Sequence, residues 1–228
     1  MPDLKDRLID AALPHVAFDG WSEGSFRAAV SEAGVTPAQG RAAFPRGAVD
    51  MAIAFHRRGD EAMAARLRAE DLTRMRFRDR VAHAVRLRLE IAQEHREAVR
   101  RGVTLFALPM HAADGMRAVW GTADAVWDAL GDTSADVNWY TKRATLAGVY
   151  SSTVLYWLGD QSDGHRDTWD FLDRRIDDVM RIEKVKAQAR KSPLVSKLMT
   201  GPNLILDRIK APARPPKGDF PGMWRDPS

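Results

Sequence analysis

Apolar residues recur at helical spacing along most of the chain. Leu4, Leu8, Ala12 and Val16, for example, repeat every four residues, which is the spacing of one face of an α-helix. Sustained alternation with a period of two, the pattern of half-buried strands, is almost absent. The pattern therefore predicts an all-α protein of about nine or ten helices.

Capping and turn residues divide this pattern into separate helices. Ser22 is a favourable N-cap for a helix through about Ala33 that ends at Gly34, and Pro37 suits the first turn of a short helix ending near Phe44. Further helices are expected over residues 47–70, 75–94, 97–107, 110–130, 137–158 and 166–190. We expect a helix-turn-helix-like unit over residues 1–50, a larger helical ligand-binding and dimerisation unit over 51–190, and a tail over 191–228.

The predicted helix 137–158 is apolar on most of its sides. One stripe carries Trp139, Leu146, Tyr150 and Trp157, and further apolar residues fill the next stripe. Such a helix is buried on most sides, or it lines a cavity or a partner surface. The sequence alone does not decide between a solid core, a homodimer bundle and a ligand cavity.

No constellation of catalytic residues is convincing. Residues 20–24 match the G-x-S-x-G pattern, but a hydrolase elbow needs a strand before the serine, and here a helix precedes Ser22. There is no cysteine, no H-E-x-x-H, no E-x-x-H pair and no phosphate-binding glycine loop. His56 and Asp60 share a helix face, a pair that usually forms a surface hydrogen bond. We therefore expect a binding protein with no catalytic residues, metal or cofactor.

The net charge of +4 is unevenly distributed. Residues 181–228 carry 11 basic and 4 acidic residues, whereas the remaining 24 basic and 27 acidic residues give the body a net charge of −3. The ten arginines between Arg57 and Arg88 are interspersed with acids, which is typical of a solvated helix face. The excess positive charge therefore lies in the tail.

Residues 4–55 resemble the N-terminal helix-turn-helix domain of TetR-type transcription regulators, whose second half binds small molecules in a helical pocket. The turn at residues 33–36 and Phe44 carry this resemblance. DNA binding needs basic residues around the recognition helix, yet residues 1–50 carry five basic and seven acidic residues, and the expected recognition helix offers only Gln39 and Arg41. We expect no nucleic-acid partner, and a TetR-type regulator with a small-molecule pocket is the alternative function.

Two further blocks are more specific. Residues 136–144 read D-V-N-W-Y-T-K-R-A and residues 167–176 read D-T-W-D-F-L-D-R-R-I. Both resemble the ninth coenzyme Q biosynthesis protein family, and the similarity extends over roughly residues 4–180. The resemblance implies a TetR-like fold and a non-enzymatic, usually dimeric accessory protein of ubiquinone synthesis. Such a protein binds an isoprenoid quinone precursor and presents it to the di-iron demethoxyubiquinone hydroxylase at the membrane surface.

The resemblance also suggests where the sites lie. The motif places the hydroxylase-binding surface at Trp139 and Tyr140, with Val126, Trp127 and Asn138 nearby, and exposed aromatics are favourable centres for such an interface. A polyprenyl chain leaves a bilayer only for another apolar environment. We expect the pocket for it, or for another apolar lipid, to be lined by Leu87, Leu105, Leu108, Leu146, Tyr150 and Val154.

The tail has the pattern of a membrane-surface helix. Apolar residues within 192–210 gather on one face with basic residues around them, and the expected membrane contacts are Leu194, Val195, Leu198, Met199, Ile205, Leu206 and Ile209. Docking of this segment on the protein itself is the alternative. With no signal peptide or membrane span recognised, we expect a cytoplasmic protein peripheral to the bacterial inner membrane, or one on the matrix side if organellar.

Overall fold

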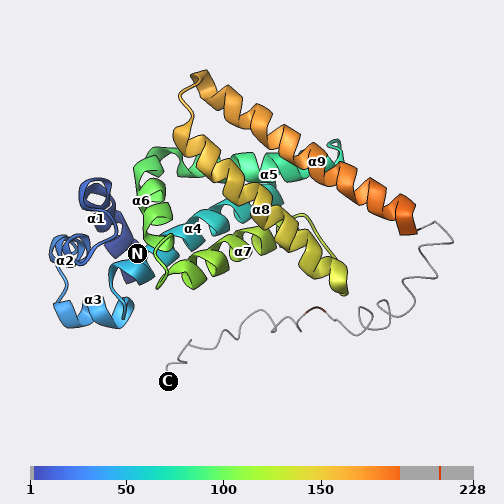
Figure 1. Ribbon diagram of the computed structural model, residues 1–228. Helices are drawn as coiled ribbons and strands as arrows, with labels where there is room; N and C mark the ends of the chain where they lie inside the picture. Colours follow the sequence, from blue (N-terminus) through green and yellow to red (C-terminus); the bar gives the residue numbers. More distant parts are fainter. Residues whose placement is uncertain (1–2, 191–210, 212–228) are drawn as a thin grey trace.

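The computed structural model describes residues 3–190 and residue 211, and all of their regular structure is helical. The confirmed all-α architecture is shown in Figure 1. Its helices are α1 (Leu4–Asp19), α2 (Glu23–Glu32), α3 (Pro37–Ala43), α4 (Ala48–Ala69), α5 (Phe77–Ala92), α6 (Arg96–Phe106), α7 (Ala112–Ala129), α8 (Val137–Gly159) and α9 (Arg166–Arg190). Single-turn 3-10 helices, Gln93–His95 and Asp163–His165, lead into α6 and α9.

The short helices α2 and α3 begin at reciprocal capping boxes. The Ser22 hydroxyl accepts the Ser25 backbone N–H at 3.2 Å, while the Ser25 hydroxyl accepts the Ser22 N–H at 3.0 Å. Thr36 and Gln39 repeat the arrangement at the start of α3. Ser22 therefore serves the backbone, as its sequence context predicts.

The close packing of α3 on α2 depends on Gly40. A Cβ atom at this position would lie 2.5 Å from a methyl group of Val30. Only a residue without a side chain lets the two helices approach this closely, so the helix-turn-helix-like outline is set by a steric requirement.

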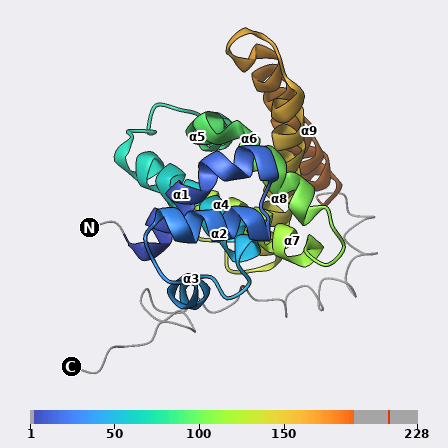
Figure 2. The same cartoon turned by 90° about the vertical axis from the view of Figure 1, so that its left-hand side faces the viewer.

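The helices form two joined groups. The first has a core shared by α1, α2 and the start of α4, built around Leu8, Val16, Phe26 and Met51. The second lies between α4, α5, α7, α8 and α9. Figure 2 shows α1, α2 and α3 in front of this larger group, and α8 lies between α7 and α9 in Figure 1. The long helix α4 belongs to both groups and ties them together.

No helix in the described part of the chain combines the length and the apolar character needed to cross a bilayer. The seven expected membrane contacts within 192–210 lie outside the described residues. Ala211 is described, and its backbone N–H donates to the Ala135 carbonyl at 3.0 Å. This residue therefore lies against the loop that precedes α8.

Candidate functional site

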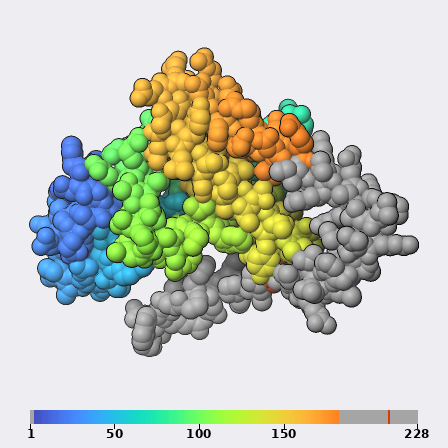
Figure 3. All heavy atoms as spheres, in the orientation of Figure 1, coloured from blue at the N-terminus to red at the C-terminus, as the bar shows by residue number. Residues whose placement is uncertain are grey.

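A cavity of about 680 Å³ lies among α4, α5, α6, α7 and α8. In the space-filling view a hollow opens between α6 and α7, in green, and α8, in yellow, with teal atoms of the deeper helices at its bottom (Figure 3). Its walls are mostly apolar and include Phe55, Leu89, Val103, Phe106, Val119 and Val154. The volume is within the ~300–1,000 Å³ range of small-molecule sites. Helix α8 therefore lines a cavity on one side and packs into a core on the other.

Small residues on α8 create this space. Ala144, Ala147, Gly148 and Ser151 face the cavity, and a Cβ atom added at Gly148 would meet no other atom within 4 Å. Met116 on α7 and Leu155 on α8 line the cavity and are also exposed, which places apolar side chains at its mouth. Exposed apolar surface around an apolar hollow is typical of a site for an apolar ligand.

A polar cluster adjoins the deep end of the cavity. The Arg88 Nε donates to Asp60 Oδ1 at 2.7 Å, and the Thr122 hydroxyl donates to the same oxygen at 2.9 Å. The His56 Nε2 lies 2.8 Å from the Thr122 hydroxyl oxygen. Burial lowers the pKa of His56 to about 4, so the imidazole is neutral at neutral pH. Burial likewise raises the pKa of Tyr150, whose ring meets that of His56 edge to face.

The predicted pocket residues are only partly brought together. Tyr150 and Val154 line the cavity, but Leu87 and Leu146 are buried in the core of the larger helix group. Leu105 packs toward the core of α1 and α2, and Leu108 lies beyond the end of α6 with 45% of its surface exposed. Those four were misplaced because α5, α6 and α8 have apolar residues on more than one face. Periodicity does not say which face meets empty space.

The polar cluster was not predicted as a site. His56 and Asp60 do share a face of α4, but Asp60 is buried and His56 is mostly covered, and Arg88 of α5 completes the cluster. The expectation that residues 57–88 form a solvated arginine face is therefore wrong for Arg88, which is buried. A possible signal was Gly59, a glycine in the middle of a helix beside an acid.

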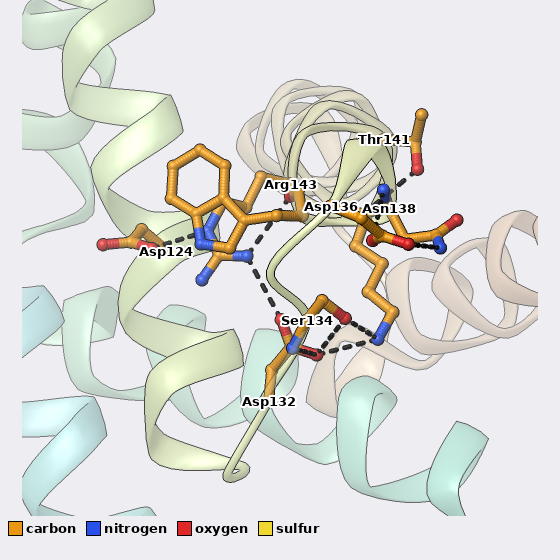
Figure 4. Close-up of polar contacts among 9 residues, drawn as sticks. Asp124, Asp132, Ser134, Asp136, Asn138, Thr141 and Arg143 are labelled. Carbon is orange, nitrogen blue, oxygen red and sulfur yellow. Dashed lines mark hydrogen bonds and ion pairs between the residues drawn. The ribbon is translucent and has the colours of Figure 1, made fainter. Parts of the chain in front are cut away.

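The second candidate site surrounds the start of α8 and is held by Arg143 (Figure 4). This arginine is fully buried, and its Nε donates to Asp124 Oδ1 at 2.6 Å while its Nη1 donates to Asp132 Oδ2 at 3.2 Å. Its guanidinium stacks on the Trp139 ring with 4.0 Å between the guanidinium carbon and the ring centroid. Arg143 thus fastens α7, the loop before α8, and α8 to one another.

Asp132 is held by several donors at once. Burial on its own would raise its pKa, but hydrogen bonds from Lys142, Ser134 and Arg143 outweigh that effect and lower the pKa to about 2. The Lys142 Nζ lies 2.7 Å from Asp132 Oδ1. The loop before α8 is therefore fixed by a carboxylate that is ionised at neutral pH.

Two of the expected partner residues, Asn138 and Tyr140, are exposed at the start of α8. Asp136 is the N-cap, accepting the Asn138 backbone N–H at 3.0 Å and the Asn138 side-chain amide at 2.9 Å. Tyr140 is 37% exposed, and its ring lies edge-on to Trp139 with centroids 4.8 Å apart. Asn138 and Tyr140 are thus the surface part of the expected partner site.

The other three expected partner residues are buried. Val126 and Trp127 belong to the core. The Trp127 ring stacks on the Phe77 ring, and the Lys142 ammonium lies over it. Trp139 is only 9% exposed. The expectation of exposed aromatics at 127 and 139 is therefore wrong, because Arg143 draws Trp139 inward and Phe77 covers Trp127. Binding of a partner at this surface stays a prediction.

Comparison with known proteins agrees with this architecture and its motifs. A family model described as COQ9 matches residues 112–183, which include α7, α8 and much of α9. The mitochondrial ubiquinone biosynthesis protein COQ9 of Drosophila melanogaster is 30% identical over 189 residues, covering 81% of this chain and 58% of the fly protein. The corresponding human protein is 27% identical over 196 residues, covering 83% of this chain and 61% of its own length.

The chain therefore spans about 60% of the length of these two relatives. Among solved structures, a TetR transcriptional regulator from Nitrosomonas europaea matches with a TM-score of 0.62 at 19% identity, over 76% of this chain and 96% of the regulator. That likeness confirms the TetR-type fold predicted from the sequence. The family match falls on the helices that carry both the N-W-Y-T-K-R-A and the T-W-D-F-L blocks, and these likenesses support the COQ9 family of ubiquinone biosynthesis for this chain.

Proposed function

We propose that this protein is a non-enzymatic, lipid-binding accessory protein of ubiquinone biosynthesis. It takes an isoprenoid quinone precursor into the cavity and presents it to the di-iron demethoxyubiquinone hydroxylase at a membrane surface. The similarity to COQ9 proteins supports the pathway. The observation that supports lipid binding is the apolar cavity of about 680 Å³ that opens between α6, α7 and α8.

The energetics of the cavity suit a hydrocarbon ligand. Each Å² of apolar surface removed from water contributes about 25 cal/mol, and this attraction has no directional requirement. A wall of Leu89, Val103, Phe106 and Val154 can therefore replace the acyl environment that a polyprenyl chain leaves. Because the mouth also carries exposed Met116 and Leu155, part of a long tail can stay in contact with apolar surface outside the cavity.

The hydroxylase-binding surface that we propose centres on Tyr140 and Asn138. An exposed aromatic on a rigid helix start buries much area at low entropic cost when a partner binds. Arg143, Asp132 and the Asp136 cap provide the rigidity. Trp139, directly beneath Tyr140, contacts the cavity residue Trp120 with ring centroids 6.0 Å apart, so the partner surface lies next to the lipid.

Association with membrane and self-association complete the proposal. The exposed Leu108 and Met110 follow α6, close in sequence to the cavity residues Ala107 and Ala112, where they can meet the lipid surface from which a ligand is drawn. We place the protein as a peripheral homodimer, at the inner face of a bacterial membrane or on the matrix side of an organellar one. The segment 192–210 is its second membrane contact.

The alternative, a TetR-type transcription regulator, finds less support in the geometry of α3. Arg41 donates to Glu23 Oε1 at 2.5 Å, and its guanidinium lies 4.6 Å from the centre of the Phe26 ring. This arginine of the expected recognition helix is thus engaged within the unit itself. Phosphate contacts would first have to break its ion pair with Glu23. Salt-dependent, sequence-selective binding to genomic fragments would favour the regulator.

Lipid mass spectrometry on the purified full chain tests the proposal. We expect isoprenoid quinone precursors to co-purify with the wild-type protein and to be depleted in Gly148→Phe, where an aromatic ring fills the cavity. Gly121→Phe is the matched control, because Gly121 is also a helical glycine with open space around its Cβ but does not line the cavity. Absence of apolar lipid from wild-type protein would contradict the proposal, as would equal lipid content in all three proteins.

A further inference from the structure

The ionisable side chains of the cavity wall are gathered together. Of the described residues that line the cavity, His56, Arg88 and Tyr150 are ionisable, and they come from α4, α5 and α8. Arg88 and Tyr150 are almost wholly buried, whereas the mouth residues Met116 and Leu155 are exposed. The cavity is thus polar at its deep end and apolar from there to its mouth, which is the polarity of a ligand with an oxygen-bearing head and a hydrocarbon tail.

The position of Arg88 depends on a specific glycine. A Cβ atom at Gly59 would lie 2.6 Å from the Arg88 guanidinium carbon and 2.7 Å from both terminal nitrogens. Glycine within a helix is less favourable than alanine because it loses more backbone freedom on folding. The backbone of α4 is therefore left bare where the guanidinium lies, and Arg88 also donates to the His56 carbonyl at 3.0 Å. This contact holds the cation beside the cavity.

The charges of the cluster already balance. Arg88 is paired with Asp60, and burial keeps both His56 and Tyr150 in their neutral forms near pH 7. A carboxylate or phosphate placed here would add a negative charge beside Asp60, and an amine would add a positive charge beside Arg88. An uncompensated charge in a low-dielectric site is costly, so the cluster favours an uncharged head group with hydrogen-bonding oxygens.

We infer that His56, Arg88 and Tyr150 form a head-group site for a neutral, oxygen-bearing ring, such as a quinone, quinol or phenol. The attached hydrocarbon tail extends past Val154 toward the mouth. This inference rests on the proposed lipid binding and adds to it a specificity for the head group of the lipid. The ring oxygens pair with donors of the cluster, and the neighbouring Phe55 provides an aromatic wall. The ring is thereby held head-first, with the tail toward solvent or membrane.

Calorimetric titration of the delipidated full chain at neutral pH tests the inference with three probes. The first is a dimethoxy-methyl-benzoquinone with a decyl tail, the second is decylbenzene, which lacks oxygen, and the third is decanoic acid, which is charged. We expect wild-type protein to bind the quinone most tightly. Tyr150→Phe removes one hydroxyl and should weaken quinone binding about fivefold to tenfold while leaving decylbenzene unchanged. Tyr156→Phe is the matched control, since Tyr156 lies on the same helix outside the cavity wall.

The possible outcomes separate the inference from the proposed function. If wild-type protein binds the quinone and decylbenzene equally, or binds decanoic acid most tightly, the head-group site is refuted while lipid binding stands. A loss of equal size for both uncharged probes in Tyr150→Phe would also refute it. If no probe binds at all, the proposed lipid binding fails together with the inference. The wild-type comparison decides the matter even if Tyr150→Phe does not fold.

Discussion

The indole rings of Trp120 and Trp139 pack against each other with centroids 6.0 Å apart. Trp120 lines the cavity, and Trp139 lies beneath Tyr140 at the proposed partner surface. The two candidate sites therefore share one aromatic wall. A side chain that moves on the cavity side of this wall would change the packing under Tyr140, so the proposed lipid site and the proposed partner surface are in physical contact through these two rings.

Tyr140→Ala should remove partner binding while leaving the fold intact. A central aromatic of an interface typically contributes about 2 kcal/mol or more, so we expect the affinity for the hydroxylase to fall by about 30-fold or more. The cost in unfolding free energy should stay near ~1 kcal/mol, because the ring is already 37% exposed. Surface plasmon resonance with the immobilised hydroxylase measures the first quantity, and urea denaturation measures the second.

Tyr156→Ala is the control for that experiment. Tyr156 lies on the same helix with a similar exposure of 39%, but at the opposite end of α8 and stacked on Phe171. We expect it to leave hydroxylase affinity unchanged. Equal losses of affinity in the two variants, or no loss in Tyr140→Ala, would remove this surface from the proposal.

Trp139→Ala, in contrast, should act mainly on stability. The ring is 9% exposed and packs between the Arg143 guanidinium and the Trp120 ring, so its truncation leaves a cavity. Large-to-small changes of a buried tryptophan cost about 3–5 kcal/mol. Loss of partner binding in this variant would thus be uninformative without a denaturation curve. A change below about 1 kcal/mol would show that Trp139 is not part of the core.

Arg143→Met should be among the most destabilising single substitutions near the start of α8. It leaves the almost buried Asp132 without one of its donors and removes the bond to Asp124. Removing one partner of a buried ion pair costs about 3–5 kcal/mol, and the partial exposure of Asp124 places our expectation at the lower end. Arg117→Met removes an exposed arginine of α7 and should change stability by less than about 0.5 kcal/mol.

The helices were predictable because their ends are determined by local chemistry. Ser22, Thr36 and Asp136 each cap the helix that follows, with partners two or three residues away, and the observed helix ends lie within two residues of the predicted ones. Glycines and prolines between the helices gave the remaining boundaries. The N-W-Y-T-K-R-A block likewise indicates the family by its letters alone, because its residues are adjacent in sequence.

The cavity was not predictable in the same way. Whether an apolar residue faces a void or a neighbouring helix depends on contacts between distant segments. Leu146 and Tyr150 are one helical turn apart on α8, yet only Tyr150 lines the cavity. The residues that indicated the cavity were the small ones, Ala144, Ala147 and Gly148, because a cavity forms where side chains are short or absent. The exposure of Trp139 was misjudged for a related reason, because Arg143 and Trp120 cover it.

Gly59→Ala should destabilise the protein, although alanine is the better helix former. Its Cβ atom would lie 2.6 Å from the guanidinium carbon of Arg88, which is held by Asp60 and the His56 carbonyl. Overpacking of this kind costs about 1–3 kcal/mol. Gly121→Ala has no atom within 4 Å of the new Cβ and should stabilise by about 0.5–1 kcal/mol. We expect urea denaturation to give changes in unfolding free energy of opposite sign for the two variants. Stabilisation by both would contradict the close contact between Gly59 and Arg88.

His56 should make the stability depend on pH between about 6.5 and 4. Burial lowers its pKa in the folded protein from 6.5 to about 4, so within this window the unfolded chain binds a proton that the folded protein does not. The associated stability is fully present above pH 6.5 and is lost as the pH falls toward 4, by an amount on the order of 3 kcal/mol. In His56→Leu this contribution is absent. The difference in unfolding free energy between wild type and His56→Leu should therefore shrink by that amount from about pH 7 to about pH 4, measured by urea denaturation at constant ionic strength. A constant difference across the window would mean that the imidazole is solvated rather than buried beside the cavity.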